Sequence, residues 1–233
     1  MIANNPKVSV VMSVKNGEKT IEDSINSILN QDYKNIELLV IDDNSEDNTY
    51  IKLKKFELFE SRLKIYKNEK NIGLTKSLNF LIKKSTGDLI ARQDADDISV
   101  HNRLSKQVDY MFKFNLDAVT SRSFTRETNN KIPGFSYYLP LKLVIKYKNP
   151  FIHGTLLIKK DILFKLGLYN EDFYYAQDFK LYLDLIKNGF KIKSINEFLY
   201  YLNTKNNIST KNKNQQKYYF ECARKNIVPN ALF

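Results

Sequence analysis

A repeated alternation of strand-like and helix-like segments constrains the fold of this chain more than any other feature. A β-branched, nearly continuous apolar run at residues 8–14 is typical of a strand that is buried on both faces. Behind it, apolar residues recur at helical spacing between residues 18 and 31. Strands at 36–41 and 63–66 are each followed by a helix in the same way, and a fourth strand follows at 88–92. This order predicts βαβ units, and hence an α/β fold with a mainly parallel, Rossmann-like sheet flanked by helices.

Acidic residues follow two of the predicted strands. An Asp-Asp pair at 42–43 follows the second strand, and the sequence Asp-Ala-Asp-Asp at 94–97 follows the fourth. Because the carboxyl ends of parallel strands meet at one edge of a sheet, both groups are expected where α/β folds bind ligands. Crowded carboxylates repel one another, and a hard divalent cation that bridges them to a phosphate would relieve the repulsion. An isolated Asp-x-Asp is more often a solvated acidic turn than a metal site, so its context has to decide.

Several classes of protein are excluded by what the sequence lacks. Neither the G-x-G-x-x-G fingerprint nor the G-x-x-x-x-G-K-[ST] loop occurs, so a dinucleotide site and a P-loop are not supported. No run of about 18 apolar residues is present, and residues 1–6 lack the basic and apolar regions of a signal peptide. The single cysteine, Cys222, rules out an internal disulfide framework and is typical of a reducing compartment. We therefore expect a cytoplasmic protein.

The chain is basic, with 37 Lys and Arg residues against 26 Asp and Glu and a formal net charge of +11. This balance favours a polyanionic partner: nucleic acid, an anionic membrane surface or a phosphorylated substrate. Because most of the excess is lysine mixed with Asn and Ile, a genome's base composition explains it equally well. The charge alone does not choose among these partners.

The second half of the chain is less regular. A helix predicted at 178–188 would end at Gly189, and Asp161 would cap a short helix that ends near Gly167. The remaining predicted elements are a helix at 103–114, strands at 117–123, 155–158 and 198–202, a Pro-Gly turn within the polar stretch 125–138, and an amphipathic candidate at 218–224 in a Lys- and Asn-rich tail.

With these stretches in place, the sequence resembles a family 2 glycosyltransferase with the GT-A fold. The resemblance covers most of the chain, residues 8–209, and its matches occur in the family's order, which is far more specific than any one of them. The matching stretches are Val-Ser-Val-Val-Met-Ser-Val-Lys-Asn-Gly (8–17), Val-Ile-Asp-Asp-Asn-Ser-Glu-Asp (40–47), Asn-Ile-Gly-Leu (71–74) with Ile-Ala-Arg-Gln-Asp-Ala-Asp-Asp (90–97) and Arg-Leu-Ser-Lys-Gln (103–107), Asn-Pro-Phe-Ile-His (149–153), and Ala-Gln-Asp-Phe-Lys-Leu-Tyr-Leu (176–183).

The resemblance implies a UDP-sugar donor and a divalent metal. By resemblance, the peptide around Val14 and the side chain of Asp43 would hold the uracil, and Asp94 would reach the ribose or the sugar. Asp96 would coordinate Mn²⁺ or Mg²⁺ on the diphosphate, with Asp97 as an adjacent alternative ligand. Three further residues of the matching stretches are assigned to donor binding: Asn16, Asn71 and Arg92.

The resemblance also implies that Asp178 is the general base. The leaving UDP gains negative charge as the glycosidic bond breaks, and a metal stabilises that charge without proton transfer. The incoming hydroxyl is a poor nucleophile, so a carboxylate within hydrogen-bond reach is needed to take its proton. Attack from the face opposite the leaving group would invert the anomeric centre.

Structural alternatives to these roles stay open at this point. Asp43 could cap the following helix, and Asp178 begins a helix whose dipole favours a carboxylate in any case. Arg92 could pair with the neighbouring acids or contact the diphosphate. His153 could be structural or contact the acceptor or diphosphate, whereas His101 is expected at the surface.

The chain departs from the family pattern near its last predicted strand. Many relatives carry Arg and His near the positions of Leu202 and Thr204, and the His helps to hold the metal or the diphosphate. Neither residue is present here. We therefore expect Asp96, the diphosphate and water to hold the metal, with Lys205 as a possible aid.

The resulting prediction is an inverting, metal-dependent glycosyltransferase. It would move a sugar from a UDP-sugar to a hydroxyl of a bacterial-type surface glycan, such as lipopolysaccharide, capsule or a lipid-linked oligosaccharide. Residues 1–210 would form the GT-A domain, with a nucleotide-sugar half at 1–115, an acceptor half at 116–210 and a basic tail or helix at 211–233.

The acceptor would lie at the inner membrane face, where the basic surface and tail could contact anionic lipid. The alternatives are a nucleic-acid-binding module without catalysis, in which the acids are structural, and a sugar-nucleotide pyrophosphorylase. The sequence does not indicate the sugar, the linkage or the oligomeric state.

Overall fold

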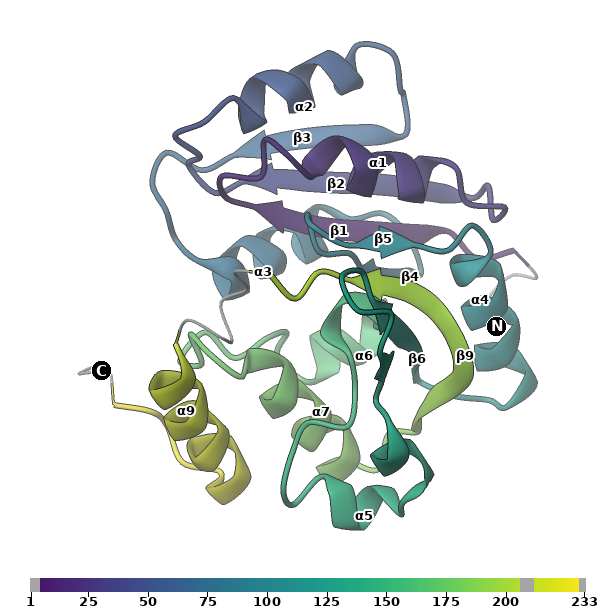
Figure 1. The fold of residues 1–233 in the computed structure, drawn as a ribbon, viewed down its shortest axis with the longest axis vertical. Helices are drawn as coiled ribbons and strands as arrows, with labels where there is room; N and C mark the ends of the chain where they lie inside the picture. Colours follow the sequence, from purple (N-terminus) through teal and green to yellow (C-terminus); the bar gives the residue numbers. More distant parts are fainter. Residues whose placement is uncertain (1–4, 206–211, 231–233) are drawn as a thin grey trace.

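The computed structural model describes residues 5–205 and 212–230, and a twisted sheet with helices on both faces forms its centre (Figure 1). In the described residues the sheet contains nine strands. They are β1 (Val8–Val14), β2 (Ile36–Asp42), β3 (Leu63–Lys67), β4 (Leu89–Arg92), β5 (Ile98–Ser99), β6 (Ala118–Thr125), β7 (Lys131–Ile132), β8 (Leu157–Lys159) and β9 (Ile192–Leu202). Their order is β3-β2-β1-β4-β8-β6-β9-β5, and β7 pairs with β6.

The first four strands confirm the predicted parallel sheet. Strands β3, β2, β1 and β4 run parallel, and Val8 lies opposite Ile36 on one side and Leu89 on the other. The crossovers are α1 (Ile21–Leu29), α2 (Thr49–Glu57) and α3 (Leu74–Lys84). The carboxyl ends of these strands therefore lie at one edge, as the alternation of the sequence predicts.

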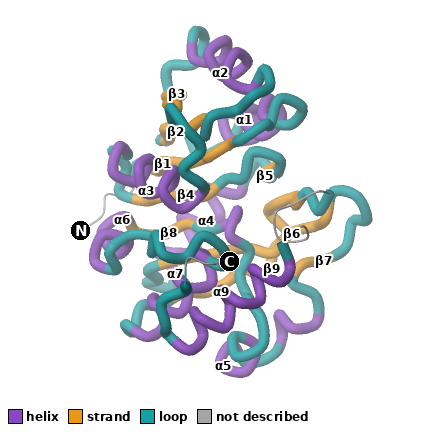
Figure 2. Tube along the Cα trace, turned by 90° about the vertical axis from the view of Figure 1, so that its left-hand side faces the viewer, coloured by secondary structure: helices purple, strands orange, loops and turns teal. Residues whose placement is uncertain are grey.

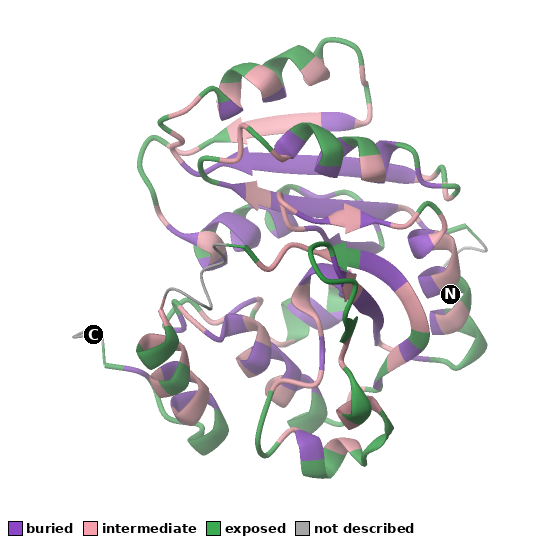
Figure 3. Cartoon of the chain, in the orientation of Figure 1, coloured by how far each residue is buried: buried purple, intermediate pink, exposed green. Residues whose placement is uncertain are grey.

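Each face of the sheet has its own apolar core, because alternate residues of a strand point to opposite faces. Val10 packs in a cluster with apolar residues of α1, α2 and α4 (Arg103–Lys113). Val11 packs in another cluster with α3, α6 (Lys160–Lys165) and α7 (Gln177–Lys187). Figure 2 shows α3 and α6 on the side of the sheet away from α1, and Figure 3 shows the buried strands between them.

The second half of the chain adds antiparallel strands to the sheet. Strand β8 runs antiparallel to both β4 and β6, whereas β6 and β9 are parallel with two irregularities in their register. The strand predicted at 198–202 begins earlier, at Ile192. Its first part was missed because the irregularities break the alternation of buried and exposed side chains. The short elements η1 (Phe135–Tyr138), α5 (Leu141–Val144) and η2 (His153–Thr155) were not predicted.

Two details of the second half correct the sequence prediction. Asp161 lies in the first turn of α6 and pairs with Lys165, so it does not cap that helix. The amphipathic candidate is longer than predicted and forms α9 (Lys213–Lys225), which buries Tyr219 and Cys222 in a cluster with Phe179 of α7. The predicted domain boundary between residues 210 and 211 lies outside the described residues. None of the described helices is both long and apolar enough to cross a membrane.

Candidate functional site

The acidic loop at 94–97 follows β4 directly and is held in shape by a buried amide. The side chain of Gln93 donates hydrogen bonds to the carbonyl oxygens of Asp94 and Asp97, at 3.2 and 2.9 Å. Its own carbonyl oxygen accepts a hydrogen bond from the Ser99 hydroxyl at 2.7 Å. Because Gln93 is fully buried, these bonds fix the direction in which the loop presents its carboxylates.

Asp94 forms an ion pair with Arg92, the last residue of β4. The Arg92 guanidinium is 1% exposed and also donates to the carbonyl oxygens of Val11 and Gln93, each at 3.0 Å. The structure thus shows the ion-pair alternative for Arg92, whereas its contact with a diphosphate stays a prediction. The backbone N–H of Asp94 donates to the Tyr200 hydroxyl at 3.1 Å, which ties the loop to β9.

Asp96 and Asp97 are the carboxylates predicted to hold the metal. Asp96 accepts a hydrogen bond from the side-chain amide of Asn203 at 3.1 Å, and Asp97 accepts one from the backbone N–H of Asn203 at 2.6 Å. Desolvation and the charge of Asp94 raise the pKa of Asp96. The same causes, with the charge of Asp96 added, raise the pKa of Asp97 well above its usual range. A cation against these carboxylates would relieve the repulsion.

The donor set fits a divalent cation that has few protein ligands. In the described part of the chain, no group of three or more His, Cys, Asp or Glu side chains is arranged to hold a metal alone. Mg²⁺ is commonly held by one or two carboxylates together with substrate phosphates and water. Asp96 is better placed than Asp97, because Asp96 is half-buried whereas Asp97 is only 1% exposed.

Asp43 is held by the loop before α3. Its carboxylate accepts hydrogen bonds from the Asn68 amide at 2.7 Å and from the backbone N–H groups of Ile72 and Gly73, both at 2.9 Å. Helix α2 has a different N-cap residue, so the capping alternative for Asp43 is wrong. The backbone N–H of Asp43 donates to the Val14 carbonyl at 2.8 Å. The two predicted uracil contacts are therefore adjacent.

Asn16 and Asn71 shape the loops around Asp43. Asn16 has a left-handed φ of 54°, and its side-chain oxygen accepts a hydrogen bond from the Glu46 N–H at 2.9 Å. The side-chain oxygen of Asn71 accepts one from the Gly73 N–H at 3.1 Å. Direct contacts of Asn16 and Asn71 with the donor stay predictions.

Asp178 lies in the first turn of α7 and accepts a hydrogen bond from the Asn149 amide at 2.7 Å. Desolvation, with a smaller contribution from the charge of Asp94, raises the pKa of Asp178 to about 6. A helix dipole would lower this pKa, so it does not account for the shift. A carboxylate that titrates near neutrality suits a general base.

His153 is half-buried and carries no charge at neutral pH. Desolvation and the neighbouring Arg92 lower the pKa of His153 well below its usual value. Its Nε2 atom is hydrogen-bonded to the Tyr169 hydroxyl at 2.8 Å. A neutral, paired imidazole favours the structural alternative for His153. His101 is exposed, as expected.

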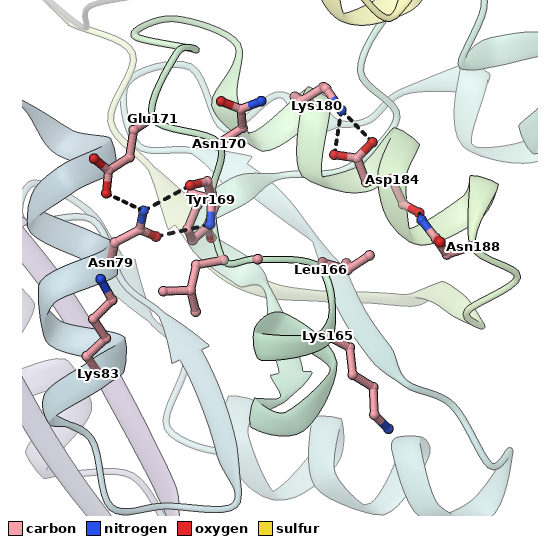
Figure 4. A pocket seen from close by; sticks show the side chains of 12 residues that line it. Asn79, Lys83, Lys165, Leu166, Tyr169, Asn170, Glu171, Lys180, Asp184 and Asn188 are labelled. Carbon is pink, nitrogen blue, oxygen red and sulfur yellow. Dashed lines mark hydrogen bonds and ion pairs between the residues drawn. The ribbon is translucent and has the colours of Figure 1, made fainter.

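A polar cleft of about 590 Å³ lies elsewhere, between α3, the loop after α6, and α7 (Figure 4). Its lining includes neither the acidic loop nor Asp178. Lys180 pairs with Asp184 there, and Asn79 donates to the Tyr169 carbonyl and to Glu171, each at 2.9 Å. Because these polar groups satisfy one another, we do not place the reaction in this cleft.

A parallel half-sheet with an acidic loop at its carboxyl edge, extended by antiparallel strands from the second half of the chain, is the arrangement of a GT-A glycosyltransferase. The model of Glycosyl transferase family 2 matches residues 9–167, and the chain belongs to that family. The chain is 36% identical over 191 residues to the UDP-Glc:alpha-D-GlcNAc-diphosphoundecaprenol beta-1,3-glucosyltransferase WfgD of Escherichia coli. The match covers 81% of this chain and 73% of that protein.

Two solved structures share the fold. S. aureus TarS 1–349 in complex with UDP has a TM-score of 0.76 at 20% identity, and the match covers 96% of this chain and 67% of that one. Mannosyltransferase PcManGT from Pyrobaculum calidifontis, in complex with GDP-Man and Mn²⁺, has a TM-score of 0.75 at 19% identity, over 94% of this chain and 64% of that one. The chain thus spans about two thirds of each solved chain.

Four residues of the site were missed by the sequence analysis: Gln93, Asn149, Tyr200 and Asn203. Asn149 and Gln93 lie in stretches that resemble the family's motifs, so their position was a usable signal. Tyr200 lies within a predicted strand and Asn203 just after it, and nothing in the local pattern distinguishes them. Only the pairing of β9 with β5 and β6 brings both beside the acidic loop.

Proposed function

We propose that this chain transfers a sugar from a UDP-sugar to a glycan hydroxyl with inversion, and that Asp178 is the general base. The observation that carries the proposal is the position of Asp178, partly desolvated, held by Asn149 and within electrostatic reach of Asp94. Family membership favours sugar transfer over the nucleic-acid-binding and pyrophosphorylase alternatives.

The donor half would bind the nucleotide through groups that are already fixed. Asp43 and the Val14 peptide would contact the uracil, and Asn16 and Asn71 would hold the surrounding loops in shape. Asp94, oriented by the buried Arg92, would receive the ribose or sugar hydroxyls. UDP is favoured over other nucleotides because the E. coli relative is named for a UDP-Glc donor, although one neighbour of the same fold was solved with GDP-Man.

The acceptor hydroxyl would approach Asp178 from the opposite side of the sugar. The ionised carboxylate takes the hydroxyl proton as the new glycosidic bond forms and the bond to the UDP oxygen breaks. Asn149 donates to one carboxylate oxygen, and backbone N–H groups in the first turn of α7 also favour the ionised form of Asp178. A divalent cation, Mn²⁺ or Mg²⁺, held by Asp96 and if needed Asp97, would neutralise the charge on the leaving diphosphate.

The acceptor that fits best is a lipid-linked or surface glycan of the bacterial type. The E. coli relative is named for a diphosphoundecaprenol-linked acceptor. Such an acceptor would place the enzyme in the cytoplasm at the inner face of the plasma membrane, in peripheral contact with anionic lipid. The net charge of +11 supports this contact.

The test is Asp178→Asn, which keeps the shape of the side chain and removes the base. We expect transfer to fall by about 100-fold or more, as is usual for loss of a general base, while the affinity for the UDP-sugar is retained. Transfer is measured by release of UDP in the presence of acceptor, and affinity by calorimetry.

Asp184→Asn is the matched control, because Asp184 lies on the same helix and pairs with Lys180. It should leave both quantities near wild type, since partly exposed ion pairs contribute little. Transfer by Asp178→Asn at the wild-type rate would remove Asp178 from the mechanism.

A further inference from the structure

An exposed apolar surface lies at one end of the molecule, in residues 135–148. Figures 1 and 2 place α5, which belongs to this segment, at the end opposite α2. We call the following exposed side chains, together with the exposed lysines 142, 146 and 148, the α5 surface: Phe135 (79% exposed), Tyr147 (74%), Tyr138 (64%), Leu143 (47%) and Leu139 (38%).

The α5 surface is held firmly by the fold beneath it. Val144 is buried, and Ile145 packs against the cluster that α7 and α9 share. The Arg224 guanidinium of α9 donates a hydrogen bond to the Lys146 carbonyl at 3.1 Å. The outward apolar side chains therefore belong to a segment that is anchored to the rest of the fold, and the fold itself keeps them exposed.

The charge of this surface has one sign. The chain has no acidic residue between Glu127 and Asp161, and lysines alternate with the apolar residues of the α5 surface. Another exposed apolar pair, Leu58 and Phe59 after α2, is flanked by acids on both sides instead. Exposed aromatic and aliphatic side chains among lysines are typical of segments that lie in the interface of an anionic bilayer.

We propose that the α5 surface docks this protein on anionic lipid. Aromatic and leucine side chains would enter the head-group region, and the three lysines would contact lipid phosphates. A protein partner or a second copy of the chain would also cover apolar side chains, but it would have to be acidic to match the lysines. A second copy presents the same basic surface and would be repelled.

The α5 surface and the candidate site are adjacent along the chain. Lys148 immediately precedes Asn149, whose amide donates to Asp178 at 2.7 Å. Docking would therefore present the acceptor side of the site toward the membrane, a consequence that rests on the proposed function. Helix α9 is a weaker candidate than the α5 surface, because its buried residues Tyr219, Cys222 and Ala223 are already used in packing.

Vesicle flotation tests the docking without any sugar transfer. We expect the protein to float with vesicles of phosphatidylglycerol and phosphatidylcholine and to stay behind with phosphatidylcholine alone. Two triple variants should each lower the bound fraction about tenfold or more at fixed lipid. They are Phe135→Ser/Leu143→Ser/Tyr147→Ser and Lys142→Gln/Lys146→Gln/Lys148→Gln.

The controls remove similar side chains elsewhere. Leu58→Ser/Phe59→Ser alters exposed residues just after α2, and Lys55→Gln/Lys83→Gln/Lys84→Gln alters exposed lysines of α2 and α3; both variants should bind like the wild type. Unchanged melting temperatures would show that the α5 variants are folded. Equal losses in the controls, or α5 variants that float like the wild type, would overturn the proposal.

Two further outcomes are distinguishable. Self-association in light scattering that the α5 variants abolish, without flotation of the wild type, would make this surface an interface between copies and would also overturn docking. Transfer to a water-soluble acceptor should be the same in the α5 variants and the wild type. Wild type that floats but transfers no sugar would count against the proposed function and leave docking supported.

Discussion

The two halves of the chain differ in what fixes their structure. In the first half, β2 is buried along its whole length and β1 along nearly all of it. In the second half, residues 135–148 leave five large apolar side chains exposed, and β9 pairs with β6 only through two irregularities. Burial on both faces therefore specifies the first half locally, whereas contacts between distant segments specify the second.

This difference explains how much of the fold could be predicted. The strand predicted at 8–14 agrees with β1, and the helix predicted at 103–114 agrees with α4 to one residue. The strand predicted at 198–202 misses the first part of β9, because a bulged strand does not keep a period of two. Short elements such as β5 and β7 carry too few residues to show any period.

The residues of the candidate site likewise differ in how far the sequence alone could predict them. The acids of the loop at 94–97 follow a strongly patterned strand, so their place at the sheet edge could be predicted. Gln93, Tyr200 and Asn203 set the loop's shape and the environment of its carboxylates, but each is a single polar residue whose role depends on a tertiary contact. The raised pKa values of Asp96 and Asp97 follow from that environment and could not be predicted from the sequence.

The largest expected effect is on the affinity for UDP, which we assign to the first half of the chain. Asp96→Ala should weaken UDP binding in the presence of Mn²⁺ by about 100-fold, because a cation with few protein ligands depends strongly on each of them. EDTA should weaken UDP binding to the wild type to a similar extent, whereas Asp178→Asn should bind like the wild type. Calorimetric titration of UDP into these three samples, and into the wild type with Mn²⁺ as the reference, measures the differences.

Asp23→Ala, which alters an exposed acid of α1, is the matched control for the loss of charge. Tight UDP binding by Asp96→Ala, or equal binding with Mn²⁺ and EDTA, would show that the first half binds the nucleotide without a metal at this loop. Repeating the titration with GDP would then show whether the base has been assigned correctly.

A smaller effect on transfer is expected at Gly154, where the second half of the chain packs against the acidic loop. A Cβ atom at Gly154 would lie against the Tyr200 hydroxyl and 2.8 Å from Asp94 Oδ2, so Gly154→Ala must displace part of the site. We expect a loss of stability of about 1–3 kcal/mol, typical of overpacking, and about a tenfold loss of transfer. Chemical unfolding and steady-state rates measure the two effects.

Gly87→Ala is the matched control for Gly154→Ala. A Cβ at Gly87 would lie 2.6 Å from the Lys7 carbonyl and 2.7 Å from Ser9 Oγ, at the amino end of the sheet and away from the acidic loop. It should cost similar stability and leave the transfer rate of the folded enzyme unchanged. Equal losses of transfer in both variants would mean that Gly154 acts only through stability.

The smallest expected effect depends on pH and tests the second half alone. The Asn149 amide stabilises the ionised form of Asp178, so Asn149→Ala should raise the pKa of Asp178 above its value of about 6. Because the base must be ionised, transfer falls as pH drops through this pKa, and the acidic limb of the rate profile should move up by about half a unit to one unit. The variant should then lose transfer about two- to fivefold at pH 6 and almost none well above the new pKa. Asn188→Ala, which removes an amide bonded to a helix carbonyl at the other end of α7, should leave the limb in place. A loss that is the same at every pH would make Asn149 a residue that shapes the acceptor site without tuning the base.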